Sequence, residues 1–179
     1  MGQILAYREE AIRAMELLSA DDRVLFVGQD IIYPGVSMIY ETLKNVPLSK
    51  KIEMPVAEDM QLGMCTGLAL AGYIPVSIYP RIDFLILATN QLVNHLDKIE
   101  EMSCGQFKPK VIIRTMVGSI KPLNPGAQHC QDHTEALECL VPNIDVVKLG
   151  IAEIIVPAYK AALESDKSSI LIEMTELYY

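Results

Sequence analysis

Glu58 is the acidic residue whose position best suits proton chemistry. It follows Pro55, which ends the predicted strand Lys51–Met54, and it begins a predicted helix that continues to Ala71. A carboxyl group held at the start of a helix can exchange a proton with a ligand within hydrogen-bond reach. The same position also has a structural interpretation, because a negative charge stabilises the amino terminus of a helix. Position alone favours the structural interpretation.

A segment rich in Gly and Pro, from Gly118 to Asp132, carries further reactive side chains. His129 can accept or donate a proton near neutral pH. Together with Cys130 and His133 it forms a His-Cys-x-x-His run. Two imidazoles and one thiol in a loop make only a partial site of the kind that zinc uses. We therefore predict no metal ion bound by this chain.

The elements that must position these residues follow from hydrophobic periodicity. Apolar runs of strand length alternate with segments of helical period, which predicts a three-layer α/β/α fold with a mostly parallel sheet of about six strands. The predicted strands are Arg23–Val27, Lys51–Met54, Ile74–Tyr79, Lys110–Thr115, Asp145–Lys148 and Ser169–Glu173. The predicted helices are Ile4–Ser19, Ser37–Leu43, Glu58–Ala71, Asp83–Met102, a short segment ending at Leu140, and Ile151–Leu163. No linker divides the chain, so we expect residues 1–179 to form one domain.

Ligands of open parallel sheets bind beyond the carboxyl ends of the strands. Gly28 and Asp30 follow the first predicted strand, Glu58 follows the second, and Phe84 follows the third. His129 lies in the loop after the fourth. These residues are the candidates for the binding site.

Composition limits the classes of function. The chain has 179 residues, of which 51% are hydrophobic and 21% charged, as in globular proteins. A net charge of -8 disfavours nucleic-acid binding, which requires a basic surface. The apolar runs are too short and interrupted to span a bilayer, and the amphipathic start does not resemble a signal peptide. The four cysteines contain no Cys-x-x-Cys pair, so we expect reduced thiols in a cytoplasmic protein.

Gly63 and Gly67 lie four residues apart on the predicted helix, with Ala71 at the next step. Residues at this spacing share a helix face, and small side chains let another backbone approach closely. We expect tight packing at this face. The packing partner is either another subunit or another helix of the same domain.

The spacing of Glu58, Gly63, Met64 and Gly67 resembles the signature of the pyrimidine-binding domain of thiamine diphosphate enzymes, in the transketolase and 2-oxo acid dehydrogenase superfamily. Further landmarks resemble the beta subunit of the decarboxylase component of 2-oxo acid dehydrogenases over essentially the whole chain. They are Pro55–Glu58, Leu70–Val76, Asp83-Phe84, Asn90–Asn94, Met102–Gln106, Gly126–His129, Ile172-Glu173 and Leu177-Tyr178.

The resemblance implies a role for each candidate residue. Glu58 would hydrogen-bond the ring nitrogen of the cofactor's aminopyrimidine and promote its imino tautomer. Phe84 would lie against the pyrimidine ring, and His129 would handle the substrate carboxylate or acyl group. Gly28 and Asp30 are predicted to contact the cofactor, and Gly63 and Gly67 to form an interface.

Enzymes of this family hold the cofactor's diphosphate through Mg²⁺ or a similar ion, which is bound by a Gly-Asp-Gly motif followed by Asn. The sequence contains no such motif. The resemblance therefore implies a separate diphosphate-binding subunit of alpha type, which binds the metal and shares thiamine diphosphate with this chain in an α2β2 heterotetramer. We expect this chain to be inactive alone, and to lack the diphosphate-binding domain and the C-terminal transketolase domain. Truncation of a longer chain would explain the same ending.

The resemblance thus implies a subunit of an enzyme that decarboxylates a 2-oxo acid and transfers the acyl or aldehyde group. A subunit of a split transketolase, which transfers a two-carbon ketol unit, is the alternative enzyme. A non-catalytic interaction or regulatory module is the alternative from another class, against which the joint retention of Glu58, Phe84 and His129 argues. A flavodoxin-like nucleotide binder would need a glycine-rich phosphate loop, which Gly28–Ile31 does not provide.

Overall fold

The computed structural model describes residues 6–33, 38–118, 120–121 and 124–179. In this part of the chain six strands form one sheet in the order β2-β1-β3-β4-β6-β5, and every neighbouring pair is parallel. The strands are β1 (Val24–Gly28), β2 (Lys51–Glu53), β3 (Ile74–Tyr79), β4 (Ile112–Val117), β5 (Asp145–Leu149) and β6 (Ser169–Met174). The α-helices are α1 (Tyr7–Ser19), α2 (Ile39–Thr42), α3 (Glu58–Leu70), α4 (Ile82–Leu85), α5 (Ile99–Met102), α6 (Thr134–Leu140) and α7 (Ile155–Glu164). Single turns of 3₁₀ helix span Leu48–Lys50, Ile86–Ala88, Ala127–His129, Ala152–Ile154 and Thr175–Tyr178.

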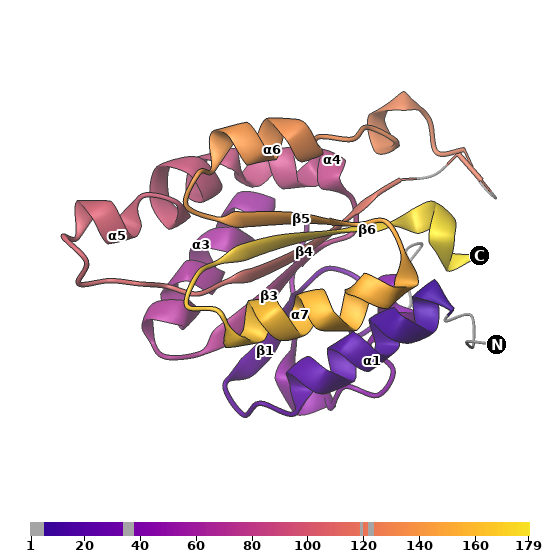
Figure 1. The fold of residues 1–179 in the computed structure, drawn as a ribbon, viewed down its shortest axis with the longest axis horizontal. Coiled ribbons are helices and arrows are strands. Elements are labelled where there is room, and N and C mark those ends of the chain that lie inside the picture. The colour runs from indigo at the N-terminus through magenta and orange to yellow at the C-terminus, as the bar shows by residue number, and fades with distance from the viewer. Residues whose placement is uncertain (1–5, 34–37, 119, 122–123) are drawn as a thin grey trace.

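Helices cover both faces of the sheet, as predicted. Figure 1 shows α1 and α7 on one side of the strands and α4 and α6 on the other. One apolar core lies beneath α1 and α7, and a second lies between the sheet and α3, α4 and α6. The central strands β3 and β4 are buried along their whole length, because both of their faces are covered. The three-layer α/β/α prediction is confirmed.

The direction of strand addition reverses between β1 and β3. The chain passes from β1 to β2 at one edge and then returns to place β3 on the other side of β1. Open α/β sheets bind ligands at such a reversal, beyond the carboxyl ends of the strands. Gly28 ends β1 there, and a Cβ at this position would lie 2.6 Å from the carbonyl oxygen of Ile78. Only glycine therefore allows the two strands to approach this closely.

The prediction of one continuous helix over Asp83–Met102 is wrong. The segment begins as α4, continues through a 3₁₀ turn and a π-helical stretch at Asn90–Leu96, and breaks at Asp97 and Lys98 before α5. The break has a tertiary cause. The buried Asp97 carboxylate accepts hydrogen bonds from the backbone N–H and side-chain amide of Asn143, at 2.9 and 3.2 Å.

The remaining boundaries differ from the predictions by small amounts. β4 begins and ends two residues later than predicted, because Met116 and Val117 still pair with β6. The helix predicted from Ile151 starts with a 3₁₀ turn before α7. The predicted start of the first helix and part of the predicted helix Ser37–Leu43 lie outside the described residues. Within the described ranges, no helix is both long enough and apolar enough to cross a membrane.

Candidate functional site

A cavity of about 190 Å³ lies at the carboxyl ends of β1 and β3, where the direction of strand addition reverses. Its lining comes from segments that are far apart in the sequence. The lining residues are Gln29, Asp30, Glu58, Tyr79, Pro80, Arg81, Phe84 and His129. The structure thus brings four predicted site residues, Asp30, Glu58, Phe84 and His129, to one pocket.

Glu58 is the first residue of α3 and is only 6% exposed. Its carboxylate makes no hydrogen bond to any described residue. Buried carboxylates in folded proteins are usually paired. The Glu58 carboxylate is therefore a candidate for contact with a ligand in the pocket.

A buried amide sets the position of Glu58. The Gln61 side-chain amide, one turn further along α3, donates to the carbonyl oxygen of Ile78 at 2.9 Å and to the Ser77 hydroxyl at 3.1 Å. The hydroxyl of Tyr79 donates to the carbonyl oxygen of Glu58 at 3.3 Å. The amino terminus of α3 is therefore tied to the end of β3.

Phe84 and His129 meet edge to face on the other side of the pocket. Their ring centroids are 5.2 Å apart, with an interplanar angle of 77°. Both side chains are half-buried. The Nδ1 atom of His129 is buried and has no hydrogen-bond partner among the described residues. The imidazole therefore keeps a nitrogen available for a ligand.

Two tethers hold the loop that carries His129, which extends past the carboxyl ends of the strands (Figure 1). The guanidinium of Arg81 donates to the carbonyl oxygen of His129 at 2.8 Å. The carboxylate of Asp83 accepts from the backbone N–H and the side-chain amide of Gln131, both at 3.1 Å. Residues at the start of α4 thus position the loop at His129 and two residues after it.

Gly118, directly after β4, makes this arrangement possible. A Cβ there would lie 2.0 Å from the carbonyl oxygen of His129 and 2.2 Å from Nη1 of Arg81. No side chain fits in that space without moving the backbone of the loop. Gly118 is therefore a site residue that the sequence analysis missed, although a glycine directly after a buried strand was a visible signal.

Asp30 adopts a positive φ of 57°, which is uncommon for a residue with a side chain. Its backbone N–H donates to Glu53 Oε1 at 2.8 Å, and Glu53 Oε2 accepts from Ile31 and Ile32 at 3.0 and 2.7 Å. Burial, and next the nearby Glu53 carboxylate, raise the pKa of Asp30. Gly28, in contrast, does not line the pocket, and its role in this structure is the close approach of β1 to β3.

Gly63 and Gly67 lie apart from the pocket, and their surroundings differ. A Cβ at Gly63 would meet the side chain of Gln91 at 3.4 Å, whereas a Cβ at Gly67 would meet nothing within 4 Å among the described residues. Met60 and Leu70, on the same side of α3 as Gly67, are 53% and 47% exposed. The outer face of α3 is therefore uncovered around Gly67.

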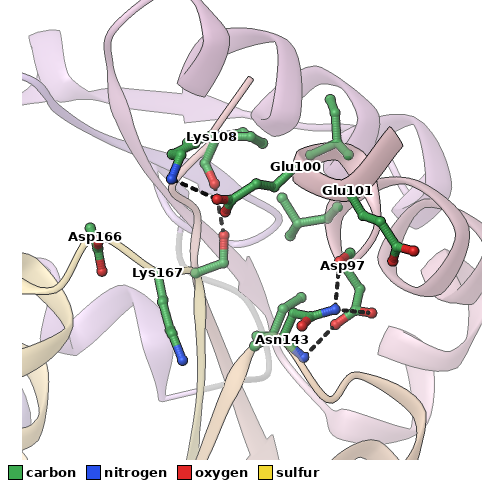
Figure 2. Close-up of a pocket in the computed structure, with 12 residues that line it drawn as sticks. Asp97, Glu100, Glu101, Lys108, Asn143, Asp166 and Lys167 are labelled. Atoms are coloured by element: carbon green, nitrogen blue, oxygen red, sulfur yellow. Dashed lines mark hydrogen bonds and ion pairs between the residues drawn. The ribbon is translucent and has the colours of Figure 1, made fainter. Parts of the chain in front are cut away.

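A second pocket, of about 300 Å³, lies at the opposite end of the sheet (Figure 2). Three of the six charged side chains of its lining, Asp97, Glu100 and Lys108, are already paired. Lys108 contacts Glu100 at 2.6 Å, and Asp97 is held by Asn143 and by Lys98. Figure 2 shows the Lys108–Glu100 and Asp97–Asn143 pairs bridging neighbouring segments, so we assign these pairs a structural role.

Nearly the whole chain matches one protein family. Residues 5–179 match the family described as "Transketolase, pyrimidine binding domain". The chain is 29% identical over 178 residues to "Pyruvate dehydrogenase E1 component subunit beta" of Cyanidium caldarium, covering 94% of this chain and 52% of that protein. It is 30% identical over 175 residues to "Pyruvate dehydrogenase E1 component subunit beta-4, chloroplastic" of Oryza sativa subsp. japonica, covering 94% and 42%. The chain thus spans about half the length of the curated relatives it matches.

Solved structures share the fold. Transketolase from Campylobacter jejuni superposes with a TM-score of 0.70 at 17% identity, covering 96% of this chain and 26% of that one. A structure named "Split gene transketolase, inactive beta4 tetramer" gives a TM-score of 0.65 at 18% identity, covering 97% and 52%. The family model matches nearly the whole chain, and the chain belongs to the family of transketolase-type pyrimidine-binding domains of thiamine diphosphate enzymes.

Proposed function

We propose that this chain is the pyrimidine-binding subunit of a split, thiamine diphosphate-dependent enzyme that acts on a 2-oxo acid. One observation carries the proposal. The buried Glu58 carboxylate has no partner among the described residues and lines the same pocket as Phe84 and His129. The names of the curated relatives, pyruvate dehydrogenase E1 beta subunits, support a 2-oxo acid as the substrate class.

The pocket suits a planar heteroaromatic ring that carries an amino group. Glu58 offers a carboxyl oxygen to a ring nitrogen, and Phe84 offers an aromatic surface to the ring. When bound, thiamine diphosphate supplies a carbon nucleophile that adds to the substrate's carbonyl group. Glu58 would hold and exchange the proton at the ring nitrogen. His129, with a free Nδ1, would hold or donate a proton at the substrate.

The rest of the cofactor site is proposed to come from a partner. The sequence contains no Gly-Asp-Gly motif, so we assign the diphosphate and its Mg²⁺ to a separate alpha-type subunit, in an α2β2 assembly. The outer face of α3, with Met60, Gly67 and Leu70, is our candidate contact. This face belongs to the helix that begins with Glu58, so a partner packed there would contact the same helix that places Glu58 in the pocket.

The test is Glu58→Gln in the complex purified from its native cells through a tag on this chain. We expect turnover of a 2-oxo acid to fall by about 10²- to 10⁴-fold while the subunits stay associated, because the amide cannot exchange the proton. The matched control is Asp59→Asn, which changes the neighbouring, exposed carboxylate of the same helix and should leave turnover unchanged.

Three results would contradict parts of the proposal. Unchanged turnover per intact Glu58→Gln complex would remove Glu58 from catalysis. A copurifying partner without Gly-Asp-Gly, or no partner at all, would favour a non-catalytic module. Turnover of a ketose in place of a 2-oxo acid would indicate a split transketolase.

A further inference from the structure

Arg81 is a charged residue of the pocket that was not among the site residues expected from the sequence. It lies between the end of β3 and the start of α4, directly beside the reversal in strand order. It lines the pocket together with Asp30, Glu58 and His129. Arg81 is the one arginine or lysine of this lining.

The charge of Arg81 is not neutralised within the described part of the chain. Its Nη1 donates to the carbonyl oxygen of His129 at 2.8 Å, and it forms no ion pair with a described carboxylate. A guanidinium has five N–H donors, so donors remain for a ligand. The other charged residues of the lining, Asp30 and Glu58, are acidic and would repel an anionic substrate.

The guanidinium is also held in place. Nη1 would lie 2.2 Å from a Cβ on Gly118, so the end of β4 confines it on one side. The carbonyl oxygen of His129 confines it on another, and the Asp83–Gln131 hydrogen bonds keep that loop in position. A donor fixed before binding loses little entropy when a ligand arrives.

We propose that Arg81 binds the anionic group of the substrate, a carboxylate or a phosphate, beside the imidazole of His129. This inference rests on the function proposed above and names the residue that recognises the anionic group of the substrate. The planar fork of a guanidinium matches both oxyanions with two parallel hydrogen bonds. Arg81 offsets the repulsion by Asp30 and Glu58, so the pocket selects substrates that carry an oxyanion near the reacting carbonyl.

The experiment is a calorimetric titration of the purified complex, loaded with thiamine diphosphate and Mg²⁺, with two probes. Oxamate stands for the carboxylate of a 2-oxo acid, and inorganic phosphate stands for a phosphorylated substrate. We expect Arg81→Met to weaken binding of the preferred anion by about 10- to 100-fold, as for the loss of charged hydrogen bonds. Arg81→Lys should restore binding in part, because it keeps the charge but loses the fork.

The matched control is Arg23→Met. Arg23 is an exposed arginine paired with Asp21 at the opposite end of β1, and its loss should change neither affinity. Preference for oxamate would identify a 2-oxo acid site, and preference for phosphate would identify a phosphorylated substrate.

Two results would overturn the inference. One is an Arg81→Met complex that still binds the cofactor and binds the anion as tightly as the wild type does. Arg81 would then only position the loop that carries His129. The other is the absence of anion binding in a cofactor-loaded wild-type complex. A wild-type complex that fails to bind thiamine diphosphate would contradict the proposed function itself, and this inference with it.

Discussion

Two acidic side chains of the pocket are held in unusual positions. Glu58 is buried without a partner among the described residues. Asp30 lies close to Glu53 at a positive φ, and burial raises its pKa, so its charge is unfavourable for folding. Binding sites commonly carry such costs, because the groups are placed for a ligand and not for the stability of the free protein. Replacing such a group should therefore stabilise the protein while harming its function.

Asp30→Asn tests this expectation at the scale of one residue. Burial and Glu53 raise the pKa of Asp30 in the folded chain, so the folded state favours the protonated form. The charged form then destabilises the fold as pH rises through the folded-state pKa. We expect the variant to melt at a higher temperature than the wild type at pH 7.5, with a smaller gain at pH 4.5, and solvent screening keeps the effect small. Asn tolerates the positive φ as well as Asp does.

Thermal unfolding followed by circular dichroism at both pH values measures the effect. Asp21→Asn is the control of opposite sign, because hydrogen bonds from Arg23 lower the pKa of Asp21 to about 2. Its charge stabilises the fold above the ordinary pKa of an aspartate, and the effect is small because the pair is exposed. A lower melting temperature for Asp30→Asn at pH 7.5 would refute the interpretation.

At the scale of elements, the loop between β4 and α6 and the start of α4 act as one unit. The Arg81–His129 and Asp83–Gln131 hydrogen bonds connect them, and Gly118 provides the space in which they meet. The position of the imidazole therefore depends on the backbone at the end of β4.

Gly118→Ala should displace this loop. The added methyl would overlap the carbonyl oxygen of His129, a backbone atom that cannot move by a rotamer change. We expect turnover of the complex to fall by about 10- to 100-fold, as for a misplaced catalytic group. Gly150→Ala is the matched control, since Gly150 also follows a strand directly but has open space for a Cβ. Equal activities of the two variants would show that the loop is not positioned this way.

The outer face of α3 is the second element-scale feature. Met60→Lys should weaken the association with the diphosphate-binding subunit at least about tenfold, because a charge would replace a buried apolar contact. Met102→Lys on α5, at the opposite end of the sheet, is the control, since Met102 is even more exposed. Binding to the purified partner by biolayer interferometry measures both. Equal affinities would place the interface elsewhere.

At the scale of the molecule, a buried polar cluster connects the neighbouring strands β4 and β6 to two helices and to the last turn of the chain. Arg114 on β4 and Glu173 on β6 are fully buried and joined by two hydrogen bonds of 2.9 Å. Tyr159 of α7 and Tyr178 of the last turn donate to Glu173, and Arg114 donates to Thr42 of α2 at 2.9 Å. The cluster thus ties five segments to one ion pair.

Arg114→Met should destabilise the protein by about 3–5 kcal/mol, because it leaves Glu173 as an uncompensated buried charge. The double variant Arg114→Met/Glu173→Leu should lose less than the sum of the single variants, since it removes both charges together. Urea unfolding of the four proteins gives the coupling free energy. Additive effects would show that the pair does not act as a unit.

Local sequence determined the elements and their order, because burial on one or both faces of a strand or helix leaves a periodic pattern. The predicted strand Ile74–Tyr79 matches β3 residue for residue, and the predicted helix start at Glu58 matches α3. The same pattern did not reveal the break at Asp97. The apolar residues Leu85, Ala88, Leu92 and Leu96 keep a helical spacing up to the break. The break itself lies at Asp97, whose carboxylate accepts a hydrogen bond from the distant Asn143.

The sequence by itself determined the α/β class, the family signature around Glu58 and the candidates Asp30, Phe84 and His129. Only the tertiary structure decided that these residues share one pocket with Arg81, that Gly118 makes room for the loop, and that Gly67 is uncovered while Gly63 is packed. The physical reason is separation along the chain. Arg81 and His129 are 48 residues apart, and their contact exists only because the strands that precede them are neighbours in the sheet.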